Sequence, residues 1–167
     1  MPVAVVVAVV LFLVADHSTS TPDRAAPSSQ PAIPTGSPVS VAPVPRTAAA
    51  DRACPAMLTE LPGKMVGQPR RPVTGAESEY AVAWGQPPII LQCGVPKPAG
   101  LTRTSQVFDI AQVTWFTPAG ASPTAPTATW TAVDREVYVR VVVPSAYPTD
   151  SVLSQVAAAI RRTMRAR

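Results

Sequence analysis

Several residue types on which catalysis and glycosylation depend are scarce or absent in this chain. Its 167 residues include no asparagine, one histidine (His17) and only 14% charged residues, against about 25% in a typical soluble domain. Without asparagine there is no acceptor for an N-linked glycan. His17 precedes every segment with a core-forming pattern, so an imidazole general base is excluded from the folded part. The length allows one ordinary domain with extensions and excludes a multidomain enzyme.

Long apolar runs are also lacking. The main one, residues 3–15, is shorter than the ~20 residues that cross a bilayer as a helix, and it fits the apolar core of a secretory signal peptide. Because no basic residue precedes this run, residues 1–15 are interpreted as either a cleaved signal peptide or a retained N-terminal membrane anchor. A buried helix or strand is the alternative. The first two interpretations predict an extracytoplasmic protein, secreted or membrane-anchored.

Residues 16–50 are rich in proline, serine, threonine and alanine and contain no aromatic residue. Such a segment buries too little apolar surface to offset its conformational entropy. We therefore expect a disordered linker, extended by its prolines, that leads to a globular domain at residues 51–167. An O-glycosylated stalk is the alternative interpretation of the same composition.

The two cysteines of the chain, Cys54 and Cys93, both lie in the expected domain. An even number of cysteines in an exported protein predicts a disulfide. A bond between Cys54 and Cys93 would close a loop of about 40 residues. In the chain-entropy model, closing such a loop stabilises the fold by about 4 kcal/mol. A metal site is not expected, because two distant cysteines without a nearby histidine do not make a ligand set.

Local periodicity predicts an α+β fold for the domain. Apolar residues at helical spacing indicate an N-terminal helix: Cys54, Met57, Leu58 and Leu61. Alternating residues indicate about five strands, at 80–84, 89–93, 107–117, 127–133 and 136–143, and a second helix is expected at 149–164. Short connections predict an antiparallel sheet flanked by the two helices, with residues 64–78 as a loop. Both cysteines fall on apolar faces, so their bond should join the first helix to the sheet from the core side.

The chemistry available for catalysis is limited to carboxylates. No glycine-rich phosphate loop and no nucleophile–imidazole arrangement is present, so no catalytic residue and no cofactor is assigned. Paired carboxylates could carry out glycan hydrolysis. The candidates are Glu77, Glu79, Asp109, Asp134 and Glu136. All of them fall at expected loops or turns, where solvated charge is ordinary, so we favour a protein that is not an enzyme.

Basic residues point to a candidate binding surface. Arg70 and Arg71 share one expected loop with Lys64, and a second expected loop carries Lys97 and Arg103. If the loops converge, they form a rim that attracts anionic wall polymers or lipid headgroups. Trp84 ends a strand beside a turn and is the tryptophan we expect to be exposed as a binding platform. The predicted binding residues are therefore Arg70, Arg71 and Trp84. Nucleic-acid binding is not expected, because no aromatic residues are interleaved with the basic ones.

Four segments carry a family resemblance: CPAML, GQPRRPV, AWGQPPIILQCGVPKPAGL and VTWF. They resemble actinobacterial envelope proteins of the family called domain of unknown function 3515. The resemblance implies an exported or anchored protein but supplies no activity and no catalytic residues. We expect a monomeric, non-enzymatic accessory or binding module of the cell envelope that recognises anionic wall or lipid components. The alternatives are a carboxylate-dependent glycan hydrolase and an extracytoplasmic domain that binds a membrane protein.

Overall fold

The computed structural model describes residues 36–76, 78–119 and 124–167. The expected signal or anchor at residues 1–15, the expected linker up to residue 35 and Glu77 lie outside these ranges. The described part contains two α-helices, a short 3-10 helix (η1) and ten strands. In chain order they are β1 (Val39–Ser40), α2 (Ala48–Glu60), β2 (Lys64–Met65), β3 (Gln68–Arg71), β4 (Val73–Thr74), η1 (Ser78–Tyr80), β5 (Ala81–Trp84), β6 (Ile89–Val95), β7 (Phe108–Ile110), β8 (Val113–Phe116), β9 (Thr127–Ala132), β10 (Tyr138–Pro144) and α3 (Thr149–Thr163).

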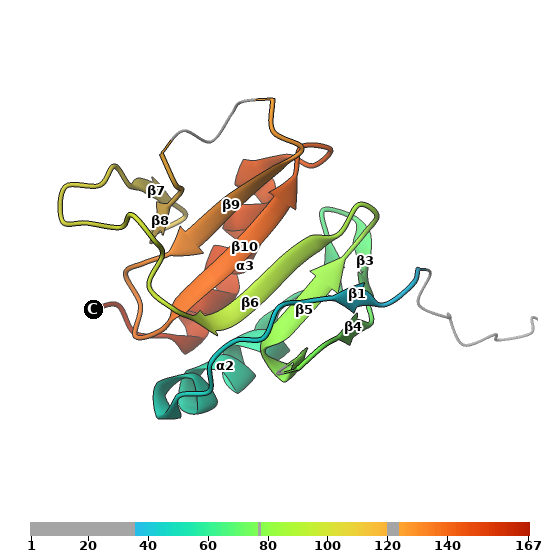
Figure 1. The fold of residues 1–167 in the computed structure, drawn as a ribbon, viewed down its shortest axis with the longest axis horizontal. Coiled ribbons are helices and arrows are strands. Elements are labelled where there is room, and N and C mark those ends of the chain that lie inside the picture. Colours follow the sequence, from blue (N-terminus) through green and yellow to red (C-terminus); the bar gives the residue numbers. More distant parts are fainter. Residues whose placement is uncertain (1–35, 77, 120–123) are drawn as a thin grey trace, which may run out of the picture. The chain divides into compact units, whose positions relative to one another are not determined.

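Eight strands form one sheet in the order β2-β3-β5-β6-β10-β9-β8-β7, and every neighbouring pair is antiparallel (Figure 1). The α+β class with two helices and an antiparallel sheet is confirmed, but the prediction of about five strands is wrong. Residues 64–78, expected as a loop, contribute β2 and β3 to the sheet and β4 beside it. Their short, proline-interrupted strands show no alternation long enough to be recognised in the sequence.

The segment expected as one strand at 107–117 is instead a hairpin of β7 and β8. The chain reverses at Ala111 and Gln112, which have φ of 50° and 62°, and Ile110 pairs with Val113 across the turn. Two-residue turns with two positive φ angles favour asparagine or glycine. Neither residue type is present at this turn, so the sequence carried no signal for the reversal.

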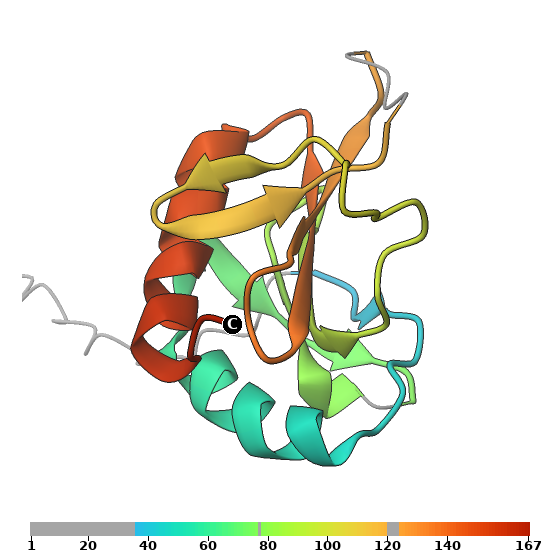
Figure 2. The same cartoon turned by 90° about the vertical axis from the view of Figure 1, so that its left-hand side faces the viewer.

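Both α-helices cover the same face of the sheet (Figure 2). α2 begins where the Thr47 side chain accepts a hydrogen bond from the N–H of Ala50 (3.1 Å), a standard way to satisfy a free helix donor. The apolar residues that the helices and strands bury between them include Met57, Leu91, Val141, Leu153 and Ile160, each 0% exposed. Neither described helix is both long and apolar enough to span a bilayer.

The opposite face of the sheet is partly covered by residues 37–45, which we call the N-terminal strap. Its β1 pairs in parallel with β4, and Val39 and Val41 pack against the β5 residues Ala81 and Ala83. The side-chain amide of Gln92 donates to the carbonyl oxygen of Ala42 at 2.7 Å. The strap therefore belongs to the folded body.

The folded body thus begins before Asp51, the boundary expected from composition. The strap valines Val39, Val41 and Val44 are 7%, 8% and 2% exposed, and α2 already begins at Ala48. A polar, proline-rich segment stays disordered when it has only its own apolar surface to bury. Here the sheet supplies an apolar surface on which a few valines dock, and the segment becomes ordered against it.

Candidate functional site

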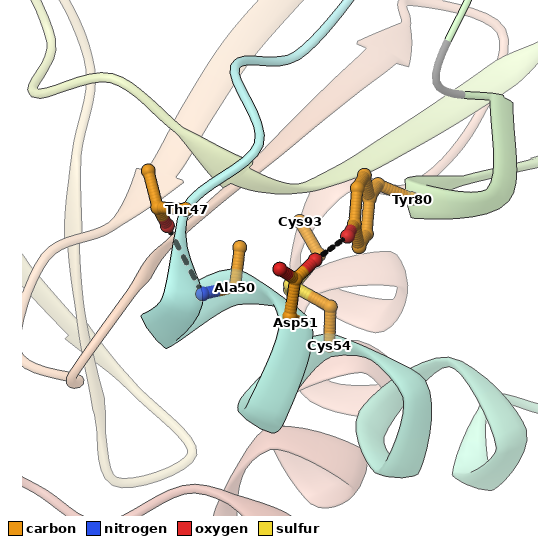
Figure 3. The surroundings of a disulfide bond; sticks show 6 residues. All are labelled: Thr47, Ala50, Asp51, Cys54, Tyr80 and Cys93. Atoms are coloured by element: carbon orange, nitrogen blue, oxygen red, sulfur yellow. Dashed lines mark hydrogen bonds between the residues drawn. A yellow bond between two sulfur atoms is a disulfide. The ribbon is translucent and has the colours of Figure 1, made fainter.

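The Cys54–Cys93 disulfide anchors the candidate site (Figure 3). It joins α2 to β6 with the two Cα atoms 5.7 Å apart, and both cysteines are 0% exposed. The predicted pairing and its position on the core side are confirmed. The bond holds α2 against the sheet at Cys54. This packing determines which α2 side chains line the groove described next.

A groove of about 640 Å³ runs between α2 and the segment formed by η1 and β5. Its lining includes Pro55 and Leu58 from α2 and Val82 from β5, which provide apolar surface. Its polar members are Arg46, Asp51, Thr59, Arg70, Glu79 and Tyr80. The groove therefore combines an apolar lining with charges of both signs.

Arg46 connects the polar members of the groove. Its guanidinium lies 3.0 Å from Glu79 Oε1 and 3.5 Å from Asp51 Oδ1, and it stacks over the Tyr80 ring at 5.4 Å. The side chains of Arg46, Asp51 and Glu79 are 57%, 47% and 53% exposed. These are solvent-accessible ion pairs, each worth at most about 1 kcal/mol, so they contribute more to the surface chemistry than to stability.

The Tyr80 hydroxyl donates a hydrogen bond to Asp51 Oδ1 (Figure 3). This bond, together with burial of the phenol, raises the pKa of Tyr80 above its ordinary value of 10.0, while nearby Arg46 acts in the opposite direction. A phenol that donates to a carboxylate resists ionisation, because the phenolate would face a like charge. Tyr80 is therefore a hydrogen-bond donor at every physiological pH.

We expect one phenol to ionise distinctly above pH 10. Because the pKa of Tyr80 is raised by folding, its contribution to stability is complete below pH 10 and is lost as the pH rises through the raised pKa. Tyrosine absorbance during an alkaline titration measures this, with Tyr80→Phe to assign the transition. Asp51→Asn should lower the midpoint, and an unchanged midpoint in that variant would contradict the role given to Asp51.

Arg70, one of the predicted binding residues, supports the end of α2. Its Nη2 donates to the carbonyl oxygens of Leu58 (3.2 Å) and Leu61 (2.6 Å), and its Nε donates to that of Pro62 (3.2 Å). A cation at a helix C-terminus satisfies free carbonyls and complements the helix dipole. Although Arg70 lines the groove, most of its donors are engaged within the protein.

Trp84, the second predicted binding residue, is 0% exposed and cannot form a surface platform. Its Nε1 donates to the carbonyl oxygen of Pro62 at 3.0 Å, and Arg70 stacks over its ring at 5.9 Å. The expectation of exposure came from its position beside a turn at the end of a strand. In the sheet that strand has β3 on one side and β6 on the other, so the ring lies in the core.

Arg71, the third predicted binding residue, faces the other side of the sheet from Arg70, because consecutive strand residues alternate. Its Nη1 donates to the carbonyl oxygen of Gly85 (3.0 Å) and to the Gln86 side chain, and its Nη2 donates to the carbonyl oxygen of Ser37. Arg71 thereby fastens the N-terminal strap. The two arginines do not converge on one anion-binding rim.

Replacing Arg70 should therefore affect stability. We expect Arg70→Ala to lower the free energy of unfolding by about 2 kcal/mol, because helix-end carbonyls lose charge-assisted hydrogen bonds. Urea denaturation measures the change, with Arg52→Ala, an exposed substitution on the same helix, as the control. A fully stable Arg70→Ala variant would mean that Arg70 is available as a surface ligand after all.

The candidate carboxylates are dispersed. Of the candidates that the structure describes, Glu79 alone lines the groove, where Arg46 links it to Asp51, which the sequence had not marked as a candidate. Asp109 accepts a hydrogen bond from Thr114 at the sheet edge (2.7 Å). Asp134 pairs with its neighbour Arg135, and Glu136 lines a separate pocket.

Sequence reasoning missed Arg46, Asp51 and Tyr80 as members of the site. Arg46 fell inside the expected linker, and Asp51 served only as the expected start of the domain. The one available signal was Thr47, a good N-cap residue placed just before an alanine run. An earlier helix start would have moved Arg46 to the edge of the domain.

Comparison with known proteins identifies a family but no characterised relative. No curated protein and no solved structure matches the chain. A family model does match, over residues 1–167. The chain belongs to the family described as protein of unknown function (DUF3515).

Proposed function

We propose that this chain is a non-enzymatic binding module of the actinobacterial cell envelope, exported and acting outside the cytoplasm. The buried Cys54–Cys93 bond supports the location, because structural disulfides persist in oxidising compartments. The groove between α2 and β5 is the binding site. Among the described residues its lining holds two arginines and two carboxylates, so this lining has balanced charge and no excess of cations to attract an anion.

A balanced groove favours an uncharged, hydroxyl-rich ligand, and a wall glycan strand has that chemistry. Guanidinium and carboxylate groups bind hydroxyls by charge-assisted hydrogen bonds, while Pro55, Leu58 and Val82 offer apolar contact to the ring faces of sugars. The observation that carries the proposal is the Arg46 bridge between Asp51 and Glu79. It places three half-exposed charged groups at one point of the groove.

The same observation disfavours the glycan-hydrolase alternative. A glycosidase needs two carboxylates with different roles, one of them a protonated acid held in an apolar setting. In this groove both Asp51 and Glu79 are exposed to solvent and share one guanidinium. Neither carboxylate therefore lies in the apolar setting that the acid of a glycosidase requires.

The proposal is tested by co-sedimentation of the full chain with purified, insoluble cell walls. We expect Arg46→Ala and Glu79→Gln each to weaken binding about tenfold, which corresponds to the ~1.4 kcal/mol of one lost charge-assisted contact. Both side chains are more than half exposed, so the fold should persist. Arg52→Ala, on α2 but outside the groove lining, is the matched control.

Two results would contradict the proposal. Equal binding by the groove variants and the control would remove the groove from function. Release of new reducing ends from wall fragments, abolished by Glu79→Gln or Asp51→Asn, would instead establish the hydrolase.

A further inference from the structure

A second surface lies at the open end of the β7–β8 hairpin. Val107 (41% exposed) and Phe108 (38% exposed) are the large apolar side chains that the described residues leave on the surface. A cavity of about 370 Å³ opens beside Phe108, which lines it together with Gly100, Phe116 and Pro118. An exposed aromatic residue at the rim of a cavity, next in sequence to an exposed valine, is a candidate interaction site.

The loop that carries this surface, residues 96–107, is held in shape by its own hydrogen bonds. Ser105 Oγ donates to the carbonyl oxygen of Gly100 (3.1 Å) and accepts from the backbone N–H of Thr102 (2.9 Å). A turn closed from Ser105 N to Thr102 O at 3.4 Å leaves Arg103, exposed, at its tip. The loop emerges beside β7 and β8 and extends away from the body (Figure 1). The exposed residues are therefore presented on an ordered protrusion.

The loop itself carries charges of one sign, although Lys97 also lines the pocket that contains Glu136. Lys97 and Arg103 are the only charged residues between positions 96 and 108, and both are exposed. The nearest acid along the chain, Asp109, accepts a hydrogen bond from Thr114 (2.7 Å). It alternates with Phe108 in β7, so the two side chains lie on opposite faces of the hairpin.

We propose that residues 96–108, the lipid-docking loop, bind the surface of an anionic membrane. Val107 and Phe108 enter the headgroup region, where apolar side chains lose contact with water, while Lys97 and Arg103 contact acidic headgroups. This pairing of exposed apolar residues with cations is the chemistry by which peripheral proteins bind anionic lipid surfaces. The absence of an acid from positions 96–108 matches a negatively charged partner.

The sheet order gives this docking an orientation. The lipid-docking loop leads into β7 at one end of the sheet, whereas the groove lies against β3 and β5 near the other end. Three strands, β6, β10 and β9, separate β5 from β8 and β7. A chain docked by this loop presents its groove away from the bilayer, toward the wall. This orientation rests on the proposed function, whereas the docking itself does not.

Fluorescence quenching of Trp130 by vesicles with brominated acyl chains tests the docking. The Trp130 ring lies 5.5 Å from that of Phe108, whereas Trp84 and Trp115 are 0% exposed. The full chain is mixed with phosphatidylcholine vesicles with or without phosphatidylglycerol. We expect quenching that depends on phosphatidylglycerol, is weakened by salt and disappears in Trp130→Phe.

Charge-neutralising variants measure the electrostatic part. Each basic residue near an anionic surface contributes about fivefold to binding, so Lys97→Gln with Arg103→Gln should lower the ratio of docked to free protein about 25-fold. The matched control is Arg52→Gln with Arg165→Gln, which removes the same charge at two exposed positions. Arg52 lies on α2, and Arg165 follows α3. Val107→Ser, at an exposed position, should weaken docking without changing the melting temperature. The N-terminal apolar run is common to all variants and cancels in the comparison.

Equal loss of quenching in the control pair would show a nonspecific effect of net charge and overturn the proposal. Quenching that persists in the loop variants, or that needs no phosphatidylglycerol, would also overturn it. Docking only to vesicles that contain membrane proteins would assign this surface to a protein partner instead of lipid. None of these results alters the wall co-sedimentation measurement, so the two proposals can fail separately.

Discussion

Loss of the Cys54–Cys93 bond is expected to lower the free energy of unfolding by about 4 kcal/mol. The bond closes a loop with a sequence separation of 39, and it limits the conformations of the unfolded chain more than it alters the folded one. Domains of ordinary size are stable by only about 5–15 kcal/mol, so this loss removes a large share of the total. The groove should be affected as well, because the bond holds α2 against the sheet.

Reduction of the unaltered chain isolates the bond from changes in side-chain volume. Urea denaturation with and without dithiothreitol measures the difference, and Cys54→Ala with Cys93→Ala should reproduce it. Both cysteines are 0% exposed, so neither should react with a thiol reagent in the native chain. Free reactivity of both thiols in folded material from intact cells would contradict the bond and, with it, the extracytoplasmic location.

Replacement of Arg135 by alanine is expected to cost about 3 kcal/mol, the lower end of the range for breaking a buried ion pair. The Arg135 side chain is 6% exposed, and its Nη1 lies 2.8 Å from Asp134 Oδ2. Its Nη2 donates to the carbonyl oxygen of Gln112 at 2.8 Å, at the turn between β7 and β8. The Arg135 backbone also forms a bridge with Ala166. One side chain therefore ties two turns together beside the C-terminal segment.

The substitution is destabilising because it leaves two acceptors without their donor in a largely dry environment. Asp134 keeps a quarter of its side-chain exposure, which limits the penalty. Urea denaturation measures the change, and Arg165→Ala, at an exposed position near the same end of the chain, should stay within about 0.5 kcal/mol of the unaltered protein. A change of similar size in both variants would mean that Arg135 acts only through net charge. Arg135→Lys should recover only part of the lost stability, because one ammonium group cannot reach Asp134 and Gln112 together.

Elements with long local patterns were predictable. The stripe of Val152, Val156 and Ile160 predicted a helix at 149–164, and α3 spans Thr149–Thr163. Alternating valines from Val137 to Val143 predicted the strand that became β10. The cysteine pairing followed from parity and from the expected compartment. In each case the signal lies within a few neighbouring residues, where periodicity reports directly which side chains are buried.

Elements without such a pattern were not predictable. β2 and β3 are short, β3 contains a proline, and the turn at Ala111 and Gln112 lacks the residues that usually mark it. The strap becomes ordered only because β5 and β6 offer it a surface. Arg70 and Arg71 are adjacent in sequence, yet the strand alternation directs one to the end of α2 and the other to the strap.

The amino-acid order by itself determined the α+β class, the two helices and the paired cysteines. Only the tertiary structure decided that Trp84 is buried and that Arg46, Asp51 and Glu79 meet in one groove. The physical reason is the range of the interactions. Periodicity and residue type act over one or two turns of chain, whereas the groove is assembled from segments that become neighbours only when α2 packs on the sheet.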